Sequence, residues 1–465
     1  MRLASVLVTG ASGEIGHGLI DQLARIGRSI VTIDIAPLEP ALARQVRREF
    51  TGSITDKWIL ERVLAEFEVD LVFHLAALLS TRSEFTPVTA HEVNVEGTLR
   101  LLEFAQHEGE SHGRPVIFMY PSSIAAYGLP DLETKMRIGR VHEDEWNVPM
   151  TMYGCNKLYC EHLGRYYAKY YKQLAVDTPP GRVDFRCVRF PGLISAVTVP
   201  AGGTSDFAPE MIHAAARGEP YACFVRPDTR IPFMAMPDAI DGLIKLASTP
   251  REKLSRTAYN VTAFNPTARE VCDVVMDAFP DARIAWEIDR KRQAIVDSWP
   301  ADVNDAAARR DWDFAPRYDF RSAFDDYLIP SGEVFRLVPF FNYLDRCTTR
   351  EHRLLNVGFA VEVPYFARRA FAGGISYFAG YPAVPELDQR VLTKMRSEVV
   401  PFVLIASEFA KEFPVRFPLT ERYVRVRYTP LLDVKIRDDL TMQILIDPNL
   451  PSRGRDQETG YPCFV

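Results

Sequence analysis

Tyr153 and Lys157 are the two residues whose types and spacing most clearly suggest chemistry. They stand four positions apart in a segment with helical patterning, so both side chains would lie on one face of a helix. A phenol is a weak acid with a pKa of about 10, and a nearby lysine ammonium favours its phenolate form. A phenolate can take the proton of a substrate hydroxyl. The pair therefore predicts a general base, although the same spacing also occurs on ordinary surface helices.

Ser123 adds a third group to this pair. It follows the buried apolar run from Pro115 to Tyr120. Hydroxyl groups at the carboxyl end of a strand in a parallel sheet lie in the crevice where ligands bind. We expect Ser123 to hydrogen-bond the substrate oxygen and hold it. A serine pair after a buried strand, followed by Tyr-x-x-x-Lys, favours catalysis over a surface helix.

A glycine-rich turn near the N-terminus predicts the cofactor of these groups. A short apolar run is followed by Gly10, Gly13 and Gly16, and then by apolar residues at helical spacing. In such a strand–turn–helix, backbone N–H groups and the helix N-terminus hold a pyrophosphate. Asp34 ends the next apolar run, where a carboxylate accepts the ribose hydroxyls of NAD and repels the extra phosphate of NADP. A bound nicotinamidium would also favour the phenolate of Tyr153 and lower its pKa.

The elements between these motifs position further candidates. The apolar run from Val69 to Ala77 predicts a central parallel strand that ends in small residues, where a cofactor could lie close to the backbone. Asp56 could accept a hydrogen bond from the adenine amino group or cap the helix after it, and both could hold. Loops are expected over residues 78–87, which include Ser80, and over the polar residues 129–150. Helices are expected over 90–106 and 152–171.

Composition excludes several classes of function. A chain of 465 residues suggests two or three domains, and its formal charge of −6, without a dense basic run, argues against a nucleic-acid partner. No apolar run is long enough for a membrane span. The seven cysteines form no Cys-x-x-Cys pair, so we expect reduced thiols and a cytoplasmic protein. The nine histidines show no metal-ligand spacing, and no metal site is expected.

Residues 1–330 resemble the extended short-chain dehydrogenase/reductase family, which includes NAD-dependent epimerases and dehydratases. The resemblance rests on Val8-Thr9-Gly10-Ala11-Ser12-Gly13-Glu14-Ile15-Gly16, His74-Leu75-Ala76-Ala77 and Tyr153-Gly154-Cys155-Asn156-Lys157. It implies an α/β fold: a Rossmann doubly wound parallel sheet over about residues 1–180, with a small substrate lobe mainly over 190–300. It also implies Tyr153 as base, Lys157 as its activator and ribose ligand, and Ser123 as the residue that orients the substrate oxygen. The implied cofactor is NAD, and the implied contacts to it are Gly10, Gly13, Glu14, Ile15, Gly16, Asp34, Asp56, Leu75, Ala76, Ala77, Asn94, Tyr153, Lys157, Pro191 and Leu193.

Within that family the chain is most similar to the L-threonine 3-dehydrogenases of the short-chain type. The strings that carry this similarity include Arg189-Phe190-Pro191-Gly192-Leu193-Ile194-Ser195, Gly202-Gly203-Thr204-Ser205-Asp206-Phe207-Ala208 and Arg292-Gln293-Ala294-Ile295-Val296-Asp297-Ser298-Trp299-Pro300. The similarity implies oxidation of the C3 hydroxyl of L-threonine or of a related β-hydroxy acid. It implies Ser80, Ser123 and Thr204 or Ser205 as substrate contacts, with Trp299 near the pocket.

Two alternatives stay open at this point. Cys155 and Asn156 replace the small or hydroxyl residues more usual inside the Tyr/Lys motif, and the loop before it is polar, so the substrate could be a nucleotide sugar and the enzyme an epimerase or dehydratase. The chain could also be a non-catalytic module that keeps NAD as a structural ligand. The intact set of Ser123, Tyr153 and Lys157 argues against that second alternative.

Residues 331–465 are expected to form a mixed α/β accessory domain after a linker at 330–332. A few strings in it faintly resemble the soluble C-terminal domain of membrane glycosyltransferases, for example Tyr343-Leu344-Asp345-Arg346-Cys347-Thr348. No catalytic constellation is visible there, so an appendage or partner-binding domain is favoured. Family members commonly dimerise through two long helices, which implies a homodimer through residues 90–106 and 152–171.

Overall fold

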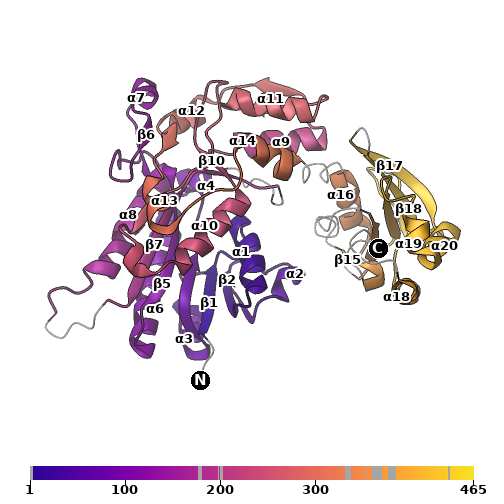
Figure 1. Cartoon of the computed structure of the whole chain (residues 1–465), viewed down its shortest axis with the longest axis horizontal. Helices are drawn as coiled ribbons and strands as arrows, with labels where there is room; N and C mark the ends of the chain where they lie inside the picture. The colour runs from indigo at the N-terminus through magenta and orange to yellow at the C-terminus, as the bar shows by residue number, and fades with distance from the viewer. Residues whose placement is uncertain are drawn as a thin grey trace. The chain divides into compact units, whose positions relative to one another are not determined.

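The computed structural model describes residues 4–175, 181–196, 198, 203–329, 337–349, 351–358, 369–374, 384–437 and 440–465. The chain forms two compact units, drawn in Figure 1. The first comprises Met1–Met211, Pro220–Pro280 and Ile284–Asp325, and the second Ile212–Glu219, Asp281–Arg283 and Asp326–Val465. The linker expected at residues 330–332 lies outside the described residues. No helix among the described residues is long and apolar enough to cross a membrane.

A seven-stranded parallel sheet organises the first unit, in the order β11-β7-β5-β4-β1-β2-β3. Its strands are β1 (Ala4–Thr9), β2 (Ile30–Asp34), β3 (Arg48–Thr51), β4 (Glu68–His74), β5 (Val116–Ser123), β7 (Val183–Phe190) and β11 (Ala258–Asn260). The direction of strand succession reverses between β1 and β4, which is where ligands bind in doubly wound sheets. The glycine-rich turn follows β1, and Ser123 closes β5. The predicted Rossmann sheet is confirmed.

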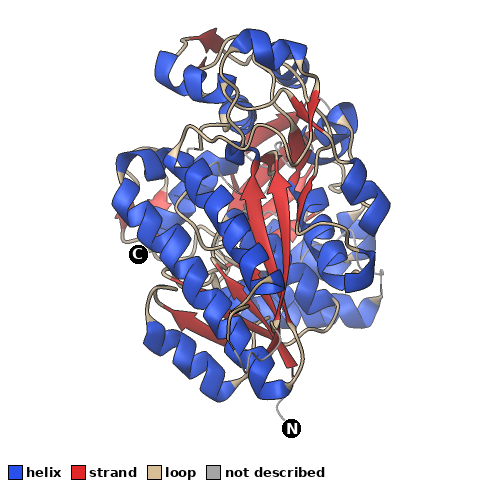
Figure 2. Ribbon diagram, turned by 90° about the vertical axis from the view of Figure 1, so that its left-hand side faces the viewer, coloured by secondary structure: helices blue, strands red, loops and turns tan. Residues whose placement is uncertain are grey.

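Helices cover both faces of this sheet, as Figure 2 shows. Leu19 and Ile20 of α1 (Glu14–Arg25), Leu243 of α10 (Met236–Ser248) and Trp312 of α13 (Ala306–Trp312) belong to the apolar core on one face. The opposite core contains residues of α3 (Lys57–Glu66), α6 (Gly97–His112) and α8 (Met152–Lys169). Because both faces are buried, the strands are almost continuously apolar rather than alternating.

Short elements surround the carboxyl ends of the strands. Residues 78–87, expected to be a loop, contain α4 (Ser80–Phe85), and α5 (Pro87–His91) and the π-helix η1 (Glu92–Glu96) come before α6. The expected polar loop at 129–150 holds α7 (Leu132–Arg137) and β6 (Arg140–Val141). Both loop expectations are wrong in part, because these segments lack a long apolar period. The remaining elements are η2 (Ile124–Ala126), β8 (Gly192–Ile194), α9 (Phe207–Arg217), β9 (Tyr221–Cys223), β10 (Phe233–Ala235), η3 (Arg251–Lys253), α11 (Ala268–Ala278), β12 (Ile284–Trp286), α12 (Arg290–Asp297), β13 (Asp302–Val303), α14 (Phe320–Ser322) and η4 (Ala323–Leu328).

The second unit contains a five-stranded mixed sheet in the order β15-β14-β16-β18-β17. Strands β14 (Arg353–Val357), β15 (Ala370–Phe371) and β16 (Phe402–Ala406) are parallel, and β18 (Leu440–Ile446) pairs antiparallel with β16 and with β17 (Thr429–Arg437). The other elements are α16 (Val338–Cys347), η6 (Ala372–Gly374), α18 (Pro385–Ser397), α19 (Phe413–Arg416), α20 (Pro418–Arg427), β19 (Gly454–Arg455) and β20 (Pro462–Cys463). The additional mixed α/β region predicted for the C-terminal part is therefore present.

A disulfide joins Cys347, the last residue of α16, to Cys463 in β20. The expectation that all cysteines are reduced is wrong for this pair, because it was drawn from spacing in the sequence and these two residues are 116 positions apart. Asp456 lies beside the two sulfur atoms, a grouping of a kind that can hold a metal ion. Its carboxylate instead accepts two bonds from Arg346, at 2.8 and 2.9 Å, and the sulfur atoms are bonded to each other.

Candidate active site

The glycine-rich turn lies directly against the end of β4. Gly10 has a φ of +70°, and a Cβ atom built on it would lie 2.5 Å from the backbone nitrogen of Ala76. A Cβ on Gly16 would lie 2.3 Å from the carbonyl oxygen of Ala11. Only glycine allows these approaches, since any side chain would push the turn off the strand. The turn therefore packs tightly against the end of β4, at Leu75 and Ala76, just before the N-terminus of α1.

Asp34 lies at the end of β2 and is bonded to the same turn. Its Oδ2 accepts the backbone N–H of Ser12 at 2.9 Å, and its Oδ1 accepts the N–H of Ala36 at 2.9 Å. These bonds fix the plane of the carboxylate while each oxygen keeps a further lone pair. The carboxylate thus stands beside the turn, where the ribose of a dinucleotide would come.

His74 and Asn94 fix the backbone around the end of β4. His74 is buried between the hydroxyls of Thr9 and Thr98, each 2.8 Å from a ring nitrogen, and burial lowers its pKa to about 3. The amide of Asn94 accepts the N–H of Leu78 at 2.8 Å and donates to the Leu78 carbonyl at 3.1 Å. Asn94 therefore holds the segment that follows Ala77, and this position inside a π-helix fits a functional site.

Tyr153 and Lys157 lie on the side of α8 that packs against β5 and η2. The Nζ of Lys157 donates to the carbonyl of Pro121 at 2.6 Å and lies 5.5 Å from the centre of the Tyr153 ring. Ser123 stands two residues after that carbonyl, and its Oγ accepts the N–H of Ala125. A Cβ on Gly154 would lie 2.1 Å from the Ala125 carbonyl oxygen, so helix and strand end are in close contact. The fold brings the three predicted catalytic residues to one place.

The pKa of Tyr153 moves opposite to the sequence-based expectation. Burial raises it well above its usual value, although Lys157 is near. Burial also lowers the pKa of Lys157 to about 8, against the opposing influence of Cys160, Cys187 and Glu161. The expected lowering of the Tyr153 pKa is therefore wrong for the chain without a cofactor. The effect of burial on this pKa is larger than the effect of the Lys157 ammonium group, so further positive charge is needed to stabilise the phenolate.

Ser80 and Thr204, predicted as substrate contacts, lie against each other. The backbone N–H of Thr204 and its hydroxyl are both 3.1 Å from the Ser80 Oγ. Arg292 of α12 donates to the carbonyl of Gly203 at 2.9 Å and so fixes the same turn. Trp299 is buried, and its backbone N–H donates to Val296. Ser205 occupies the turn after Thr204.

The other predicted cofactor contacts are spread around the strand ends. Glu14 begins α1 and accepts the hydroxyl of Thr198, and Ile15 follows it, packed against the core. Pro191 separates β7 from β8, and Leu193 pairs with Met234 in a separate two-stranded sheet of β8 and β10. Asp56 caps α3 by accepting the N–H of Trp58, which confirms the capping alternative.

Residues 6–262 match the family described as the NAD dependent epimerase/dehydratase family. The chain belongs to this family. An uncharacterized epimerase/dehydratase of Staphylococcus saprophyticus is 33% identical over 323 residues, 68% of this chain and 93% of the relative. The mitochondrial L-threonine 3-dehydrogenase of Bos taurus is 31% identical over 322 residues, 68% of this chain and 79% of the relative. The holo structure of an L-threonine dehydrogenase from Cupriavidus necator is 33% identical, with a TM-score of 0.61 over 70% of this chain and 98% of the other.

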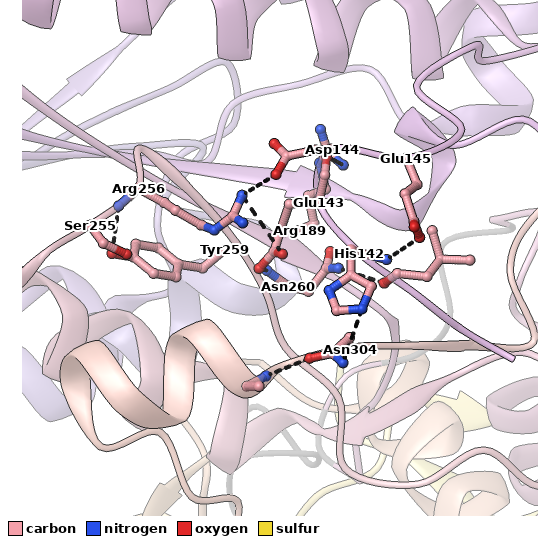
Figure 3. A network of polar contacts seen from close by, with 12 residues as sticks. His142, Glu143, Asp144, Glu145, Arg189, Ser255, Arg256, Tyr259, Asn260 and Asn304 are labelled. Carbon is pink, nitrogen blue, oxygen red and sulfur yellow. Dashed lines mark hydrogen bonds and ion pairs between the residues drawn. The ribbon is translucent and has the colours of Figure 1, made fainter.

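The sequence did not predict the buried ion pair between Glu161 and Arg189 in this epimerase/dehydratase family member. Glu161 on α8 accepts two bonds from Arg189 on β7, at 2.7 and 2.9 Å, and a third from Ser122 on β5. Figure 3 shows Arg189 in the wider network that also contains Glu143 and Asn260. The available signal was that Glu161 lies four residues after Lys157, on the same helix face.

Proposed function

We propose that this family member oxidises the C3 hydroxyl of L-threonine, or of a closely related β-hydroxy acid, with NAD as the cofactor. The proposal rests on one juxtaposition above all: Lys157 and Tyr153 on the buried side of α8, beside the strand end that carries Ser123. These groups suit proton removal from a secondary alcohol. The threonine substrate is suggested by the named relatives and by the pair of Ser80 and Thr204.

The chain's own residues fit a dinucleotide at the glycine-rich turn. Gly10 and Gly16 let the turn lie against the backbone of Ala76 and Ala11, where a side chain would collide, and α1 begins at this turn, where N–H groups at a helix N-terminus suit a pyrophosphate. Asp34 would accept the ribose hydroxyls and disfavour a phosphate there, which favours NAD over NADP. Bound there, NAD supplies the hydride acceptor.

Three side chains would manage the substrate hydroxyl. Tyr153 would take its proton, because the ammonium group of Lys157, 5.5 Å from the centre of the Tyr153 ring, favours the phenolate. Ser123 would donate to the same oxygen and hold it in place. Lys157 would stabilise the phenolate, a role that needs its own proton and therefore a pH not far above its pKa of about 8.

The substrate's amino-acid end would meet Ser80 and Thr204. Both hydroxyls are buried, and that of Thr204 donates to Ser80, so Ser80 can donate to a carboxylate and the Thr204 oxygen can accept from an ammonium group. Arg292 keeps the Thr204 turn in position through the Gly203 carbonyl. Trp299 would close the pocket nearby.

We further propose a homodimer, formed through α8 and its neighbours. Phe85 of α4, Val88 of α5 and Tyr159 of α8 expose 81, 71 and 55% of their surfaces, and the three helices pack against one another. Large apolar side chains exposed together in this way commonly mark a protein interface. The interface suits a second copy of the same chain, because two-fold contacts between identical surfaces are the commonest in oligomers.

Absorbance at the NADH band tests the catalytic proposal. Wild type and Tyr153→Phe are mixed with NAD and L-threonine, a panel of β-hydroxy acids, and nucleotide sugars. We expect NADH with L-threonine or a near relative, and a loss of about 10²–10⁴-fold in kcat for Tyr153→Phe with NAD binding retained. Product from a nucleotide sugar without net NADH would establish the epimerase alternative. NAD binding without turnover of any compound would establish the non-catalytic module.

A further inference from the structure

The carboxylate of Glu161 joins three elements that meet at the reactive groups. From α8 it accepts the hydroxyl of Ser122 on β5 at 2.5 Å and two N–H groups of Arg189 on β7. Ser122 and Arg189 are direct register partners in the sheet. All three side chains are at least nine-tenths buried. One side chain thus fixes the helix against two neighbouring strands at a single level of the sheet.

Ser123 and Lys157 lie at the same level of the sheet as Ser122 and Arg189. Ser122 immediately precedes Ser123, and the carbonyl of Pro121, on its other side, accepts Lys157. Along α8, Glu161 stands one helical turn after Lys157, on the same face. A shift of α8 along β5 would therefore change the relation of Lys157 to the strand end, and Glu161 is the charged group that opposes such a shift.

The ion pair also fixes the segment that leads into Tyr153. The Nη1 of Arg189 donates to the carbonyl of Glu143 at 3.0 Å, and the guanidinium lies over the ring of Tyr127. Tyr127 in turn donates to the Asn260 side chain at 2.8 Å. Figure 3 shows Arg189, Glu143 and Asn260 together in this network. Arg189 therefore connects the strand ends to residues 142–148, which precede the first turn of α8.

We propose that Glu161 is a positioning residue, which acts through Ser122 and Arg189. Through them it holds Ser123, Tyr153 and Lys157 in the positions that the reaction needs. This inference deepens the proposed function and rests on it for its kinetic readout. Buried ion pairs contribute little to stability relative to apolar packing, so a geometric role explains three desolvated polar groups better than stability does. A misplacement of about 1 Å at reacting groups costs on the order of a hundredfold in rate.

The test compares Glu161→Gln and Ser122→Ala with wild type and with a matched control, Asp184→Asn. Asp184 also forms a buried ion pair with an arginine of β7, Arg186, at 2.6 Å. Its register partner on β5 is Ile117, away from the strand end. Ser122→Ala leaves the Glu161–Arg189 pair intact, so a folded variant is available even if Glu161→Gln folds poorly.

For the kinetic readout, kcat is measured per NAD-binding site, so that unfolded protein does not count. We expect Glu161→Gln and Ser122→Ala to lose about 10- to 100-fold in kcat with a nearly unchanged KM for NAD. Asp184→Asn should lose thermal stability but keep its kcat within about twofold. Equal kcat values in all four proteins, or an equal loss in the control, would overturn the inference.

The pH profile separates the charge of Glu161 from its hydrogen bond to Ser122. The titratable groups around Lys157 are Tyr153, Cys160 and Glu161 on α8, Tyr120 on β5, Cys187 on β7 and His74 on β4. Glu161 raises the pKa of Lys157, so Glu161→Gln should move the alkaline fall of kcat to lower pH. Ser122→Ala keeps the carboxylate and should leave that fall in place. An unmoved fall in Glu161→Gln contradicts the assigned geometry.

Backbone hydrogen exchange of residues 119–127 tests the positioning role of Glu161 without any substrate. Glu161→Gln and Ser122→Ala should both speed exchange in this segment, and Asp184→Asn should not. If wild type oxidises nothing in the panel, the proposed function fails while this measurement still tests the inference. Unchanged exchange in both variants would overturn it.

Discussion

Ser80 and Thr204 are 124 residues apart in the chain, yet the Ser80 Oγ lies 3.1 Å from both the N–H and the hydroxyl of Thr204. We expect Ser80→Ala and Thr204→Val each to raise the KM for L-threonine about tenfold, the cost of a buried hydrogen bond, while the affinity for NAD stays unchanged. Steady-state kinetics and NAD titration measure the two effects. Thr86→Val is the control, because the Thr86 hydroxyl donates to the nearby Arg82 carbonyl at the exposed end of α4. A KM that rises equally in the control would remove the substrate assignment.

Gly10→Ala should abolish NAD binding. The new Cβ would meet the Ala76 backbone at 2.5 Å, in a left-handed conformation with a φ of +70°. Gly27→Ala is the matched control, since Gly27 has a φ of +75° and open space around it. Both variants should lose about 1 kcal/mol from backbone strain, but only Gly10→Ala should lose NAD affinity in calorimetric titration. Tight NAD binding by Gly10→Ala would contradict the assigned site.

Acid should destabilise the fold through His74. Its pKa is about 3 when folded against a usual value of 6.5, so between these pH values the unfolded chain binds a proton that the folded chain excludes. The contribution of His74 to the free energy of unfolding is therefore fully present above pH 6.5. Below that pH it decreases by about 1.4 kcal/mol per pH unit until about pH 3. Urea unfolding at several pH values measures the slope. His74→Gln should flatten it, and His162→Gln, at an exposed position, should not. Equal slopes in both variants would show that other groups govern the loss.

Reduction of the Cys347–Cys463 disulfide should weaken the second unit. The bond closes a loop over 116 positions, and a link of this length stabilises by about 3–5 kcal/mol. Unfolding with and without dithiothreitol measures the change, and Cys463→Ser should show no further effect of reductant. Thiol titration under denaturing conditions should find five free cysteines before reduction. Seven free thiols would show that the pair is reduced in the purified protein.

Phe85→Ser and Val88→Asp should convert a dimer into a monomer in sedimentation velocity. Both substitutions replace strongly exposed apolar groups that would be buried in a dimer. Leu174→Ser is the control, because Leu174 is 96% exposed but lies beyond the end of α8. A wild-type protein that sediments as a monomer at micromolar concentrations would end the dimer proposal.

The sequence predicted those parts of the site that depend on local patterns. Gly10, Gly13 and Gly16 mark a tight turn wherever they occur after an apolar run, and the four-residue spacing of Tyr153 and Lys157 fixes a common helix face. The carboxyl end of a parallel strand then brings Ser123 to the same edge. These rules act over a few residues, which is why the sheet and the closeness of Tyr153 to Lys157 could be predicted.

Other features depend on pairings that spacing does not encode. Glu161 meets Ser122 and Arg189 only because β5 and β7 are neighbours in the sheet. The Cys347–Cys463 bond needs the fold of the second unit. The raised pKa of Tyr153 needs the extent of its burial, which two neighbouring residues cannot reveal. For these features the determining quantity is distance through space.

Gly154, between Tyr153 and Cys155, leaves no space for a larger residue at its position. The position that a methyl group would occupy is already filled by the Ala125 carbonyl oxygen and by the ring of Pro149. Alanine there would push the first turn of α8 outward and carry Tyr153 away from the strand that ends at Ser123. Cys155, by contrast, is exposed. The absence of a Cβ atom at Gly154 is thus what allows Tyr153 to lie close to the end of β5.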